Sequence, residues 1–361
     1  MKIKLAVYET DRDYLQKLNM SFANKYADQV EIYAFSNEAY ALQALTDERI
    51  DVFLACEDFE MESGRIPDRC AFAYLTDGFG VGLKRVGEGI RSMEYRAIGK
   101  YQKTDLIYKE ILGLYAEKGG ISQSASGEGM VRTIMFTSPC GGCGVSTAAA
   151  AFAIHKANQG KRVLYLDMET LESTDCLFTA DGAFSMTDII YSLKKNQNLS
   201  LDLKLDSCLR KDGHGVNFLA ATDVALRMME LTIEEKNDIV NAAVKLGSFD
   251  YIIVDIPFSF DEGTRKMLLI ADTVIWLGDG TEISNEKILR AYRALQIMEE
   301  GQNVRTIDRT MLLYNRFGSR KTQVNLPELA VVDGSIPRLD KATSKETLMW
   351  MSEKDVFDKI G

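Results

Sequence analysis

One stretch of the chain, SPCGGCGVST at residues 138–147, constrains the fold more than any other. The run before it, VRTIMFT at 131–137, predicts a strand, and the alanine-rich run at 146–161 predicts a helix that ends at a glycine. A second apolar strand, RVLYLDME at 162–169, ends in acidic residues. A strand, a glycine-rich turn, a helix and a strand form the setting of a phosphate-binding loop, because backbone N–H groups at a helix N-terminus attract phosphate without any side-chain charge.

The two cysteines of this stretch leave other interpretations open. A C-x-x-C before a helix also occurs in redox dithiols, where the helix lowers a thiol pKa. A zinc site needs four ligands, and the other four cysteines and the two histidines show no paired spacing. The redox interpretation leaves the glycines and the pair Ser146–Thr147 unexplained, so the phosphate loop is favoured and the dithiol remains the alternative.

The length of 361 residues favours two domains. The segment EKGGISQSASGEGM at 117–130 is rich in Gly and Ser and has no apolar periodicity, which is linker composition. We therefore predict a first domain at 1–117, a linker at 118–130 and a second domain at 131–361. The N-terminus has no long apolar run, and the six cysteines do not form a disulfide framework, so we expect a cytoplasmic chain with reduced thiols.

The first domain alternates predicted strands and helices, which implies a parallel sheet with helices on both faces. Polar residues follow its strands in a pattern that resembles a response-regulator receiver domain: Glu9 and Asp11 after the first strand, Thr76 after the fourth and Lys100 after the fifth. The position of the receiver's phosphoacceptor aspartate is Cys56. A thiol cannot form the acyl phosphate, so the resemblance implies a flavodoxin-like, doubly wound domain that is not phosphorylated on aspartate.

Two later motifs support the phosphate loop in the second domain. FDYIIVDIP at 249–257 is an apolar strand that ends in Asp255, as expected of an aspartate that reaches Mg²⁺ beside such a loop. TMLLYNRFG at 310–318 is a further strand that ends near Asn315.

The loop and these motifs, in this order, resemble the MinD/ParA branch of P-loop ATPases, whose loop reads K-G-G-x-G-K-[ST]-T. The resemblance implies a mostly parallel sheet, ATP and Mg²⁺ as cofactors, Ser146 and Asp255 as the Mg²⁺ ligands, and Thr147 at the α-phosphate. It also implies that Asp167 and Glu169 help to position the attacking water. The cofactor-binding residues would be Gly141, Gly142, Cys143, Gly144, Val145, Ser146, Thr147, Asn315, Arg316 and Pro337.

Both lysines of the family loop are absent from this chain. The loop lysine position is Val145 and the signature lysine position is Cys140. Hydrogen bonds to charged groups contribute about 1.5–3 kcal/mol each, so we expect binding to weaken roughly ten- to a hundredfold. Hydrolysis should suffer more, because charge stabilisation supplies most of the catalysis of phosphoryl transfer.

A receiver-like domain before a MinD-like domain resembles the TadZ/CpaE family. The resemblance implies an ATP-binding spatial regulator that localises Flp/Tad pilus assembly at the cell pole, with weak or absent hydrolysis. It implies a homodimer joined through the ATPase domains and pilus or type II-like secretion components as partners. The alternative is a nucleotide-free scaffold whose ATPase fold is vestigial. The formal charge of −10 argues against sequence-specific nucleic-acid binding. The mixed charge of the last segment, TLMWMSEKDVFDKIG, favours a core-packing helix over direct membrane anchoring.

Overall fold

The structure is a computed structural model that describes residues 2–61, 65–78, 81–86, 93–118, 131–195, 200–301, 304–318 and 329–360. Its contacts divide the chain into two compact units: Met1–Gln123 with Tyr191–Cys208, and Ser124–Ile190 with Leu209–Gly361. All but the first residue of the predicted linker lie outside the described residues, so the predicted boundaries stay predictions. The first unit also includes the short segment Tyr191–Cys208, which the sequence had assigned to the second domain.

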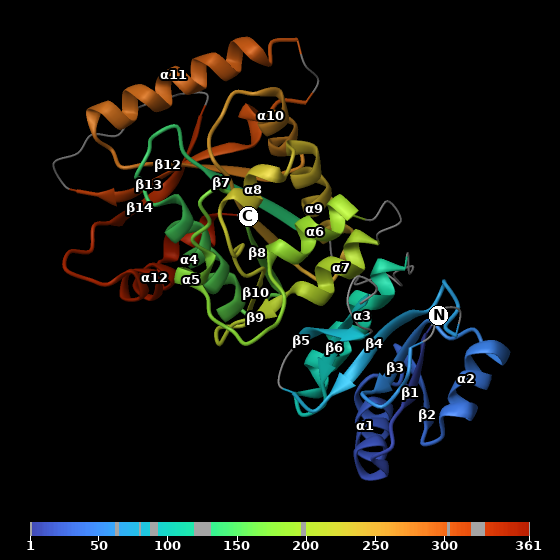
Figure 1. Ribbon diagram of the computed structural model, residues 1–361. Coiled ribbons are helices and arrows are strands. Elements are labelled where there is room, and N and C mark those ends of the chain that lie inside the picture. The colour runs from blue at the N-terminus through green and yellow to red at the C-terminus, as the bar shows by residue number, and fades with distance from the viewer. Residues whose placement is uncertain are drawn as a thin grey trace. The chain divides into compact units, whose positions relative to one another are not determined.

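The first unit contains a six-stranded sheet in the order β2-β1-β3-β4-β6-β5 (Figure 1). The neighbours pair in parallel except for β5, which runs antiparallel to β6 at the edge and was not predicted. The strands are β1 (Ile3–Tyr8), β2 (Val30–Phe35), β3 (Val52–Cys56), β4 (Ala71–Thr76), β5 (Val81–Val86) and β6 (Met93–Gly99).

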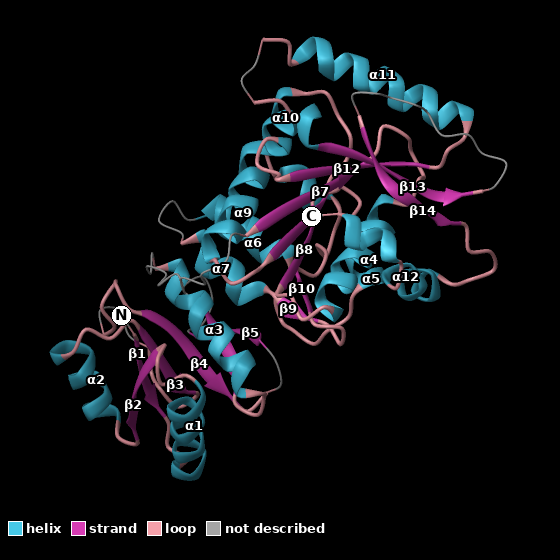
Figure 2. Ribbon diagram, turned by 180° about the vertical axis from the view of Figure 1, so that it is seen from behind, coloured by secondary structure: helices cyan, strands magenta, loops and turns pink. Residues whose placement is uncertain are grey.

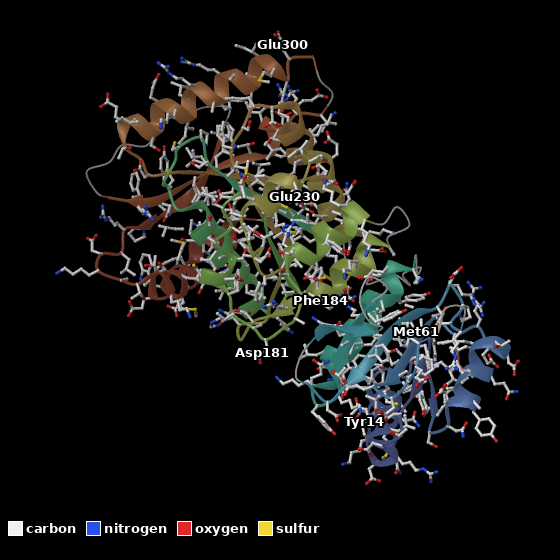
Figure 3. The ribbon with its side chains drawn as sticks, in the orientation of Figure 1. Tyr14, Met61, Asp181, Phe184, Glu230 and Glu300 are labelled. Carbon is white, nitrogen blue, oxygen red and sulfur yellow. The ribbon has the colours of Figure 1, made fainter. Side chains whose placement is uncertain are left out.

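Helices cover both faces of this sheet, which confirms the doubly wound fold. The helices α1 (Arg12–Lys25) and α3 (Thr104–Glu117) pack on the face that includes Val7 and Leu54. The helix α2 (Glu38–Asp47) packs on the opposite face with Ala6 and Phe53, because successive strand residues point to opposite sides. Tyr14 of α1, labelled in Figure 3, is partly buried and packs against the core on the Val7 and Leu54 face.

The second unit contains an eight-stranded sheet in the order β14-β13-β12-β7-β11-β8-β10-β9. All its pairs are parallel except β9 with β10, as predicted for a mostly parallel sheet. The strands are β7 (Arg132–Thr137), β8 (Val163–Asp167), β9 (Arg210–Lys211), β10 (Val216–Phe218), β11 (Tyr251–Asp255), β12 (Thr273–Gly278), β13 (Thr310–Phe317) and β14 (Ala330–Pro337).

Helices also cover both faces of the second sheet. The helix α4 (Val145–Asn158) is buried along Ala148–Ile154 and packs with α12 (Ser344–Ser352), whereas α11 (Glu282–Met298) covers the opposite face (Figure 2). The remaining helical segments of the second unit are α5 (Thr174–Leu177), the start of α6 (Met186–Lys195), α8 (Leu226–Glu230), α9 (Ile233–Leu246), α10 (Glu262–Leu268), η2 (Ile307–Arg309) and η3 (Asp355–Lys359). The end of α6 and α7 (Leu201–Cys208) lie in the segment that belongs to the first unit.

The C-terminal segment packs into the second unit, as the sequence predicted. Leu348 of α12 is buried, and Phe357 of η3 is buried against Phe152 of α4. In the described part of the chain, no helix is both long and apolar enough to cross a membrane.

Because β7, β8, β11, β12, β13 and β14 run in parallel, their carboxyl ends meet at one edge of the sheet. The segment between β7 and α4 and the residues at the ends of β8, β11 and β13 therefore lie close together. This edge contains the candidate site.

Candidate functional site

The segment between β7 and α4, residues 138–144, is called the glycine loop below. Gly142 and Gly144 have φ angles of +77° and +81°, a left-handed conformation that favours glycine. Gly144 is the N-cap of α4 and makes no side-chain capping bond, and the first turn of α4 has no acidic residue. The first N–H groups of this helix therefore remain available to an anion.

The open face of the glycine loop has room for a ligand. An added Cβ at Gly141 or Gly142 would meet no heavy atom within 4 Å, and both residues are exposed. The inner side of the loop is held by the Ser138 hydroxyl, whose oxygen lies 2.8 Å from the Cys140 carbonyl oxygen and 2.6 Å from the Leu277 carbonyl oxygen, so its single proton can bond either one. The loop is thus braced from within and open on the outside, as a phosphate cradle requires.

The two cysteines of the glycine loop are buried thiols that face inward. Cys140 and Cys143 are 4% and 3% exposed and form no disulfide. The Sγ of Cys140 accepts from the Ser284 hydroxyl at 3.2 Å and donates to the Ser284 carbonyl oxygen at 3.3 Å. Hydrogen bonds from Cys143 and Ser284 to its sulfur lower the pKa of Cys140. This burial restricts the reaction of both thiols with larger molecules and supports a packing role.

Three carboxylates gather opposite the glycine loop. The ends of β8 and β11 lie in register, so Asp167 and Asp255 are neighbours across the sheet. One carboxylate oxygen from each of Asp167, Glu169 and Asp255 lies within 4.8 Å of the other two. In the described ranges these three residues form the sole cluster of His, Cys, Asp or Glu that could hold a metal, so no zinc-like set occurs there.

Asp255 is the most deeply placed member of this cluster. It is 0% exposed, and its Oδ2 accepts from the Tyr165 hydroxyl at 3.2 Å. Its Oδ1 is buried and has no hydrogen-bond partner in the described part of the chain. Burial and the neighbouring charge of Asp167 raise the pKa of Asp255 well above its ordinary value, and the Ser146 side chain opposes the rise.

Asp167 and Glu169 differ in how many hydrogen bonds their carboxylate oxygens accept from the chain. Asp167 accepts from the backbone N–H groups of Glu169 and Ser173, at 3.0 and 2.8 Å, and from the Thr174 hydroxyl at 3.3 Å. Its carboxylate therefore holds the turn after β8 in place. Glu169 is half-buried, and burial and Asp167 raise its pKa. Of the two residues predicted to position water, Glu169 has the more available carboxylate.

The donor set suits a divalent cation that prefers oxygen. An unpartnered buried carboxylate oxygen beside two further carboxylates is costly without a positive charge. A hydroxyl and carboxylates are the ligands that Mg²⁺ takes in nucleotide sites. Asp255 and Ser146 are thus the residues that would hold the ion, and its charge would offset that of the bound phosphates.

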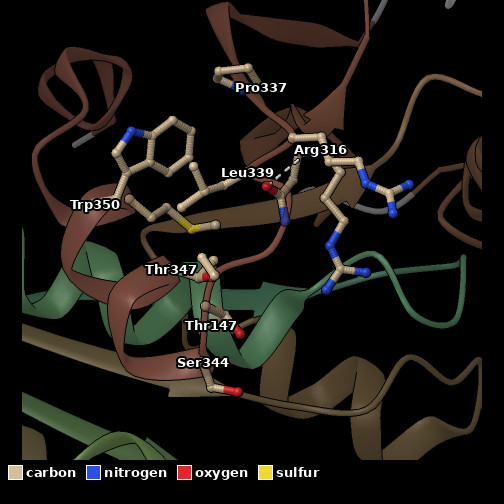
Figure 4. Close-up of a pocket in the computed structure, with 11 residues that line it drawn as sticks. Thr147, Arg316, Pro337, Leu339, Ser344, Thr347 and Trp350 are labelled. Atoms are coloured by element: carbon tan, nitrogen blue, oxygen red, sulfur yellow. Dashed lines mark hydrogen bonds between the residues drawn. The ribbon is translucent and has the colours of Figure 1, made fainter.

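A pocket of about 400 Å³ continues from the glycine loop toward α12 (Figure 4). Figure 4 shows Trp350 and Arg316 on opposite sides of this pocket, with Thr147 between them and Pro337 above. Its size lies in the range of small-ligand sites. The lining residues are Thr147, Asn315, Arg316, Pro337, Arg338, Leu339, Ala342, Ser344, Thr347, Trp350 and Met351.

The structure therefore brings together the predicted loop, acidic and strand-end residues. Asn315 lines the pocket, and its Nδ2 donates to the Cys143 carbonyl oxygen at 2.7 Å, so its amide also braces the loop. The sequence analysis missed the α12 residues of the pocket, in particular Trp350. The half-buried position that lets Trp350 line the pocket comes from the structure, and no sequence pattern reports it.

The corresponding edge of the first unit has a different arrangement. The Lys100 Nζ lies 2.9 Å from Glu9 Oε2 and 3.1 Å from Asp77 Oδ1. Asp11 caps α1 through bonds from two backbone N–H groups. Cys56 is buried, and burial raises the pKa of its thiol. The predicted acidic residues are thus engaged in an ion pair and a helix cap, and a protonated thiol lies at the phosphoacceptor position.

Comparisons with known proteins agree with both units. Residues 1–116 match the family model described as "TadZ-like, receiver domain", and residues 131–305 match the model described as "AAA domain". The septum site-determining protein MinD of Helicobacter pylori is 31% identical over 147 residues, which are 40% of this chain and 52% of that protein. The chain therefore spans about half the length of this curated relative.

Two solved structures are similar to part of the chain. A ParA family ATPase from Chlorobium tepidum has a TM-score of 0.48 at 20% identity, covering 64% of this chain and 95% of that one. The MinD of Pyrococcus horikoshii, solved with Mg-ADP, has a TM-score of 0.47 at 15% identity, covering 64% and 94%.

The two family models follow each other in the order that the sequence suggested, and the MinD relative supports the assignment of the second. The chain thus combines a TadZ-like receiver domain with a domain that matches the AAA model and is similar to MinD, an order that resembles the TadZ/CpaE-like proteins.

Proposed function

We propose that the chain binds ATP with Mg²⁺ at the glycine loop and acts as a spatial regulator of Flp/Tad pilus assembly at the cytoplasmic face of the cell pole. In this proposal Gly141–Thr147 surround the phosphates, and Ser146 and Asp255 hold Mg²⁺. The pocket between Thr147, Pro337 and Trp350 receives the nucleoside. Glu169 positions water, and Asp167 holds the turn that contains Glu169.

The observation that carries this proposal is the buried, unpartnered Oδ1 of Asp255 inside a cluster of three carboxylates. A vestigial site has no physical reason to keep such a cluster, because like charges at this separation destabilise the fold. A site that binds a divalent cation with a nucleotide has that reason. In the scaffold alternative, the repulsion among the three carboxylates would destabilise the fold and no bound cation would offset it.

Slow or absent hydrolysis follows from the charges near the loop. Val145 and Cys140 stand where the family has lysines, and neither side chain supplies a cation to a transferred phosphoryl group. Phosphoryl transfer depends mainly on positioning and charge stabilisation. Nucleotide binding through backbone N–H groups and Mg²⁺ can survive this loss, whereas turnover is reduced far more.

Pilus assembly, the polar position and a homodimer joined through the P-loop domain are proposals that rest on the TadZ/CpaE-like family. A regulator that only needs to switch between nucleotide states has no requirement for fast turnover. The same resemblance favours secretion components as partners, and any contact with the membrane would be made through them. We also place the domain boundaries near residues 117 and 131.

The direct test is calorimetric titration of the full chain with ATP, in Mg²⁺ and in EDTA, for the wild type and for Asp255→Asn. Asp238→Asn is a matched control, because Asp238 is exposed on α9 and the substitution removes the same charge. Sedimentation velocity in the same buffers measures dimerisation, and phosphate release measures turnover.

We expect Mg²⁺-dependent ATP binding in the wild type and in Asp238→Asn, at least a tenfold loss in Asp255→Asn, and dimerisation only with ATP. Turnover should be far slower than one per second. No ATP binding at millimolar nucleotide in any buffer would refute the proposal and favour the scaffold. A fluorescent fusion that fails to gather at a pole in a pilus-bearing cell would refute the localisation alone.

A further inference from the structure

The candidate site has an unbalanced charge near the loop. A nucleoside triphosphate brings several negative charges to an edge that already contains Asp167, Glu169 and Asp255. One divalent cation at Asp255 does not neutralise them. The two positions at which the MinD/ParA loop has lysines are Cys140, buried on Ser284, and Val145 in the first turn of α4. A further positive charge from another element would therefore strengthen nucleotide binding beyond what the backbone N–H groups and Mg²⁺ provide.

Arg316, near the end of β13, places a guanidinium directly beside the glycine loop. Its Nη1 donates to the Gly142 carbonyl oxygen at 2.8 Å. An ideal Cβ at Gly144 would lie 3.5 Å from its Nη2 and 3.7 Å from its Cζ. The charged group thus lies along the loop from Gly142 to the N-terminus of α4, on the side that also borders the pocket (Figure 4).

The backbone of Arg316 is held in an uncommon conformation that directs the side chain there. Its φ angle is +54°, the left-handed region, which costs an arginine about 1 kcal/mol. Asn315, 1% exposed, stabilises this turn: its Oδ1 accepts from the Arg316 backbone N–H at 2.9 Å, and its Nδ2 donates to the Cys143 carbonyl oxygen at 2.7 Å. One amide therefore links β13 to the loop and fixes where the arginine begins.

An arginine in this position can brace the loop and contact a phosphate at the same time. A guanidinium has five N–H donors in a planar fork, so it can bond a loop carbonyl oxygen and a phosphate oxygen at the same time.

We propose that the Arg316 guanidinium supplies to the nucleotide phosphates the positive charge that the lysine-free loop lacks. This inference rests on the proposed function, because it requires a nucleotide at the glycine loop. Arg316 is a binding residue in cis, placed by β13 and by Asn315, and it contacts the phosphates from the side of the loop opposite Asp255. Its contribution rises with the number of phosphates on the ligand.

The test measures the affinity of the full chain for ATP, ADP and AMP at fixed Mg²⁺, with four variants. Arg316→Gln removes the charge and Arg316→Lys keeps it. Arg316→Gly removes the side chain at a position where positive φ costs glycine nothing, so the turn after Asn315 is preserved. Arg290→Gln is the charge-matched control, since Arg290 lies on the exposed face of α11 and pairs with Glu286.

We expect Arg316→Gln and Arg316→Gly to weaken ATP binding roughly ten- to a hundredfold, ADP binding less, and AMP binding least. Arg316→Lys should stay within about fivefold of the wild type, and Arg290→Gln should not differ from it. The dependence of ATP affinity on salt should also become shallower in the two uncharged variants.

An equal loss for ATP, ADP and AMP, with no recovery in Arg316→Lys, would show that Arg316 only braces the loop and would overturn the inference. Unchanged ATP affinity in Arg316→Gly would overturn it as well. If the wild type itself binds no nucleotide, the proposed function fails first, so the two failures are distinguishable.

Discussion

Replacing Asp255 by asparagine should stabilise the second unit when no divalent cation is present. The substitution keeps the size of the side chain, and the asparagine oxygen can still accept from the Tyr165 hydroxyl. It removes one charge from a cluster in which the oxygens of Asp167, Glu169 and Asp255 lie within 4.8 Å of one another.

The magnitude follows from Coulomb's law. Two unit charges 4.8 Å apart repel by about 3.5 kcal/mol at an effective dielectric constant near 20. Asp255 faces two such neighbours, but its raised pKa means that proton uptake relieves part of this cost. We therefore expect a net gain of about 1–3 kcal/mol in the free energy of unfolding, or an increase of about 2–10 °C in melting temperature.

Differential scanning calorimetry in EDTA and in Mg²⁺ measures both halves of this reasoning. In EDTA, Asp255→Asn should have a higher melting temperature than the wild type, and Asp238→Asn should have the same melting temperature as the wild type. Added Mg²⁺ should stabilise the wild type according to RT ln(1 + [Mg²⁺]/Kd) and leave Asp255→Asn unchanged. A lower melting temperature for Asp255→Asn in EDTA would show that the cluster is not under electrostatic strain, and the argument for a cation there would lose its basis.

Three further substitutions or labels test other parts of the structure. Gly144→Ala places a Cβ 2.8 Å from Asn315 Nδ2 at a φ of +81° and should cost about 2–4 kcal/mol in a urea melt, whereas Gly160→Ala, at +79° with no atom within 4 Å, should cost only about 1 kcal/mol. Equal costs would mean that Asn315 does not press on the loop. Glu117→Gln should cost about 1–3 kcal/mol at pH 7, because it leaves the buried Lys204 without its 3.0 Å partner. Burial raises the pKa of Glu117, but Arg96 and Lys204 lower it by more, so the pKa lies below its ordinary 4.5. The stabilisation from the ion pair is therefore present above pH 4.5 and should fade below it. A cost of Glu117→Gln that does not change with pH would contradict the ion pair. In thiol titration of the native chain, the exposed Cys176 should react first and the buried Cys140 and Cys143 slowly, while reaction of the latter pair at the rate of a free thiol would revive the redox alternative.

The elements with a strong pattern of apolar residues could be predicted from the sequence, and so could their order along the chain. The buried strand that became β11 and the alanine-rich helix that became α4 show patterns that few other structures satisfy. The order of strand, loop and acidic strand ends placed Asp167 and Asp255 at one edge, because parallel strands end on the same side of a sheet.

Short elements escaped prediction because tertiary contacts hold them more than local sequence does. The strand β10 has three residues and α5 has four, too few for a period to be visible. The helix α9 is different: Thr232 and Glu235 form a capping box and Gly247 ends the helix in the left-handed conformation, so the sequence did contain both of its boundaries.

The role of Asn315 shows where motif reasoning ends. A motif assigns a residue to a ligand, but a buried amide must satisfy its own hydrogen bonds whether or not a ligand is present. Here both polar atoms of Asn315 bond to the chain, one to the Arg316 backbone and one to the Cys143 carbonyl oxygen. These bonds join two segments 172 residues apart, and no pattern in either segment alone reports such a contact.

The same contact explains how the loop can lack lysine and keep its shape. In a loop that binds phosphate through its own lysine, the charge and the backbone cradle lie in one segment. In this chain Ser138 and Ser284 secure the buried start of the glycine loop, while Asn315 and Arg316 secure its end at the carbonyl oxygens of Cys143 and Gly142. Ser284 acts through the sulfur of Cys140, so the buried thiol at position 140 takes part in holding the loop, whereas Val145 makes none of these bonds. The consequence for an engineered recovery of turnover is specific: in the proposed site, Val145→Lys would add a second cation beside Arg316, and both would act on the phosphates, because the carboxylates of Asp167, Glu169 and Asp255 leave the edge short of positive charge.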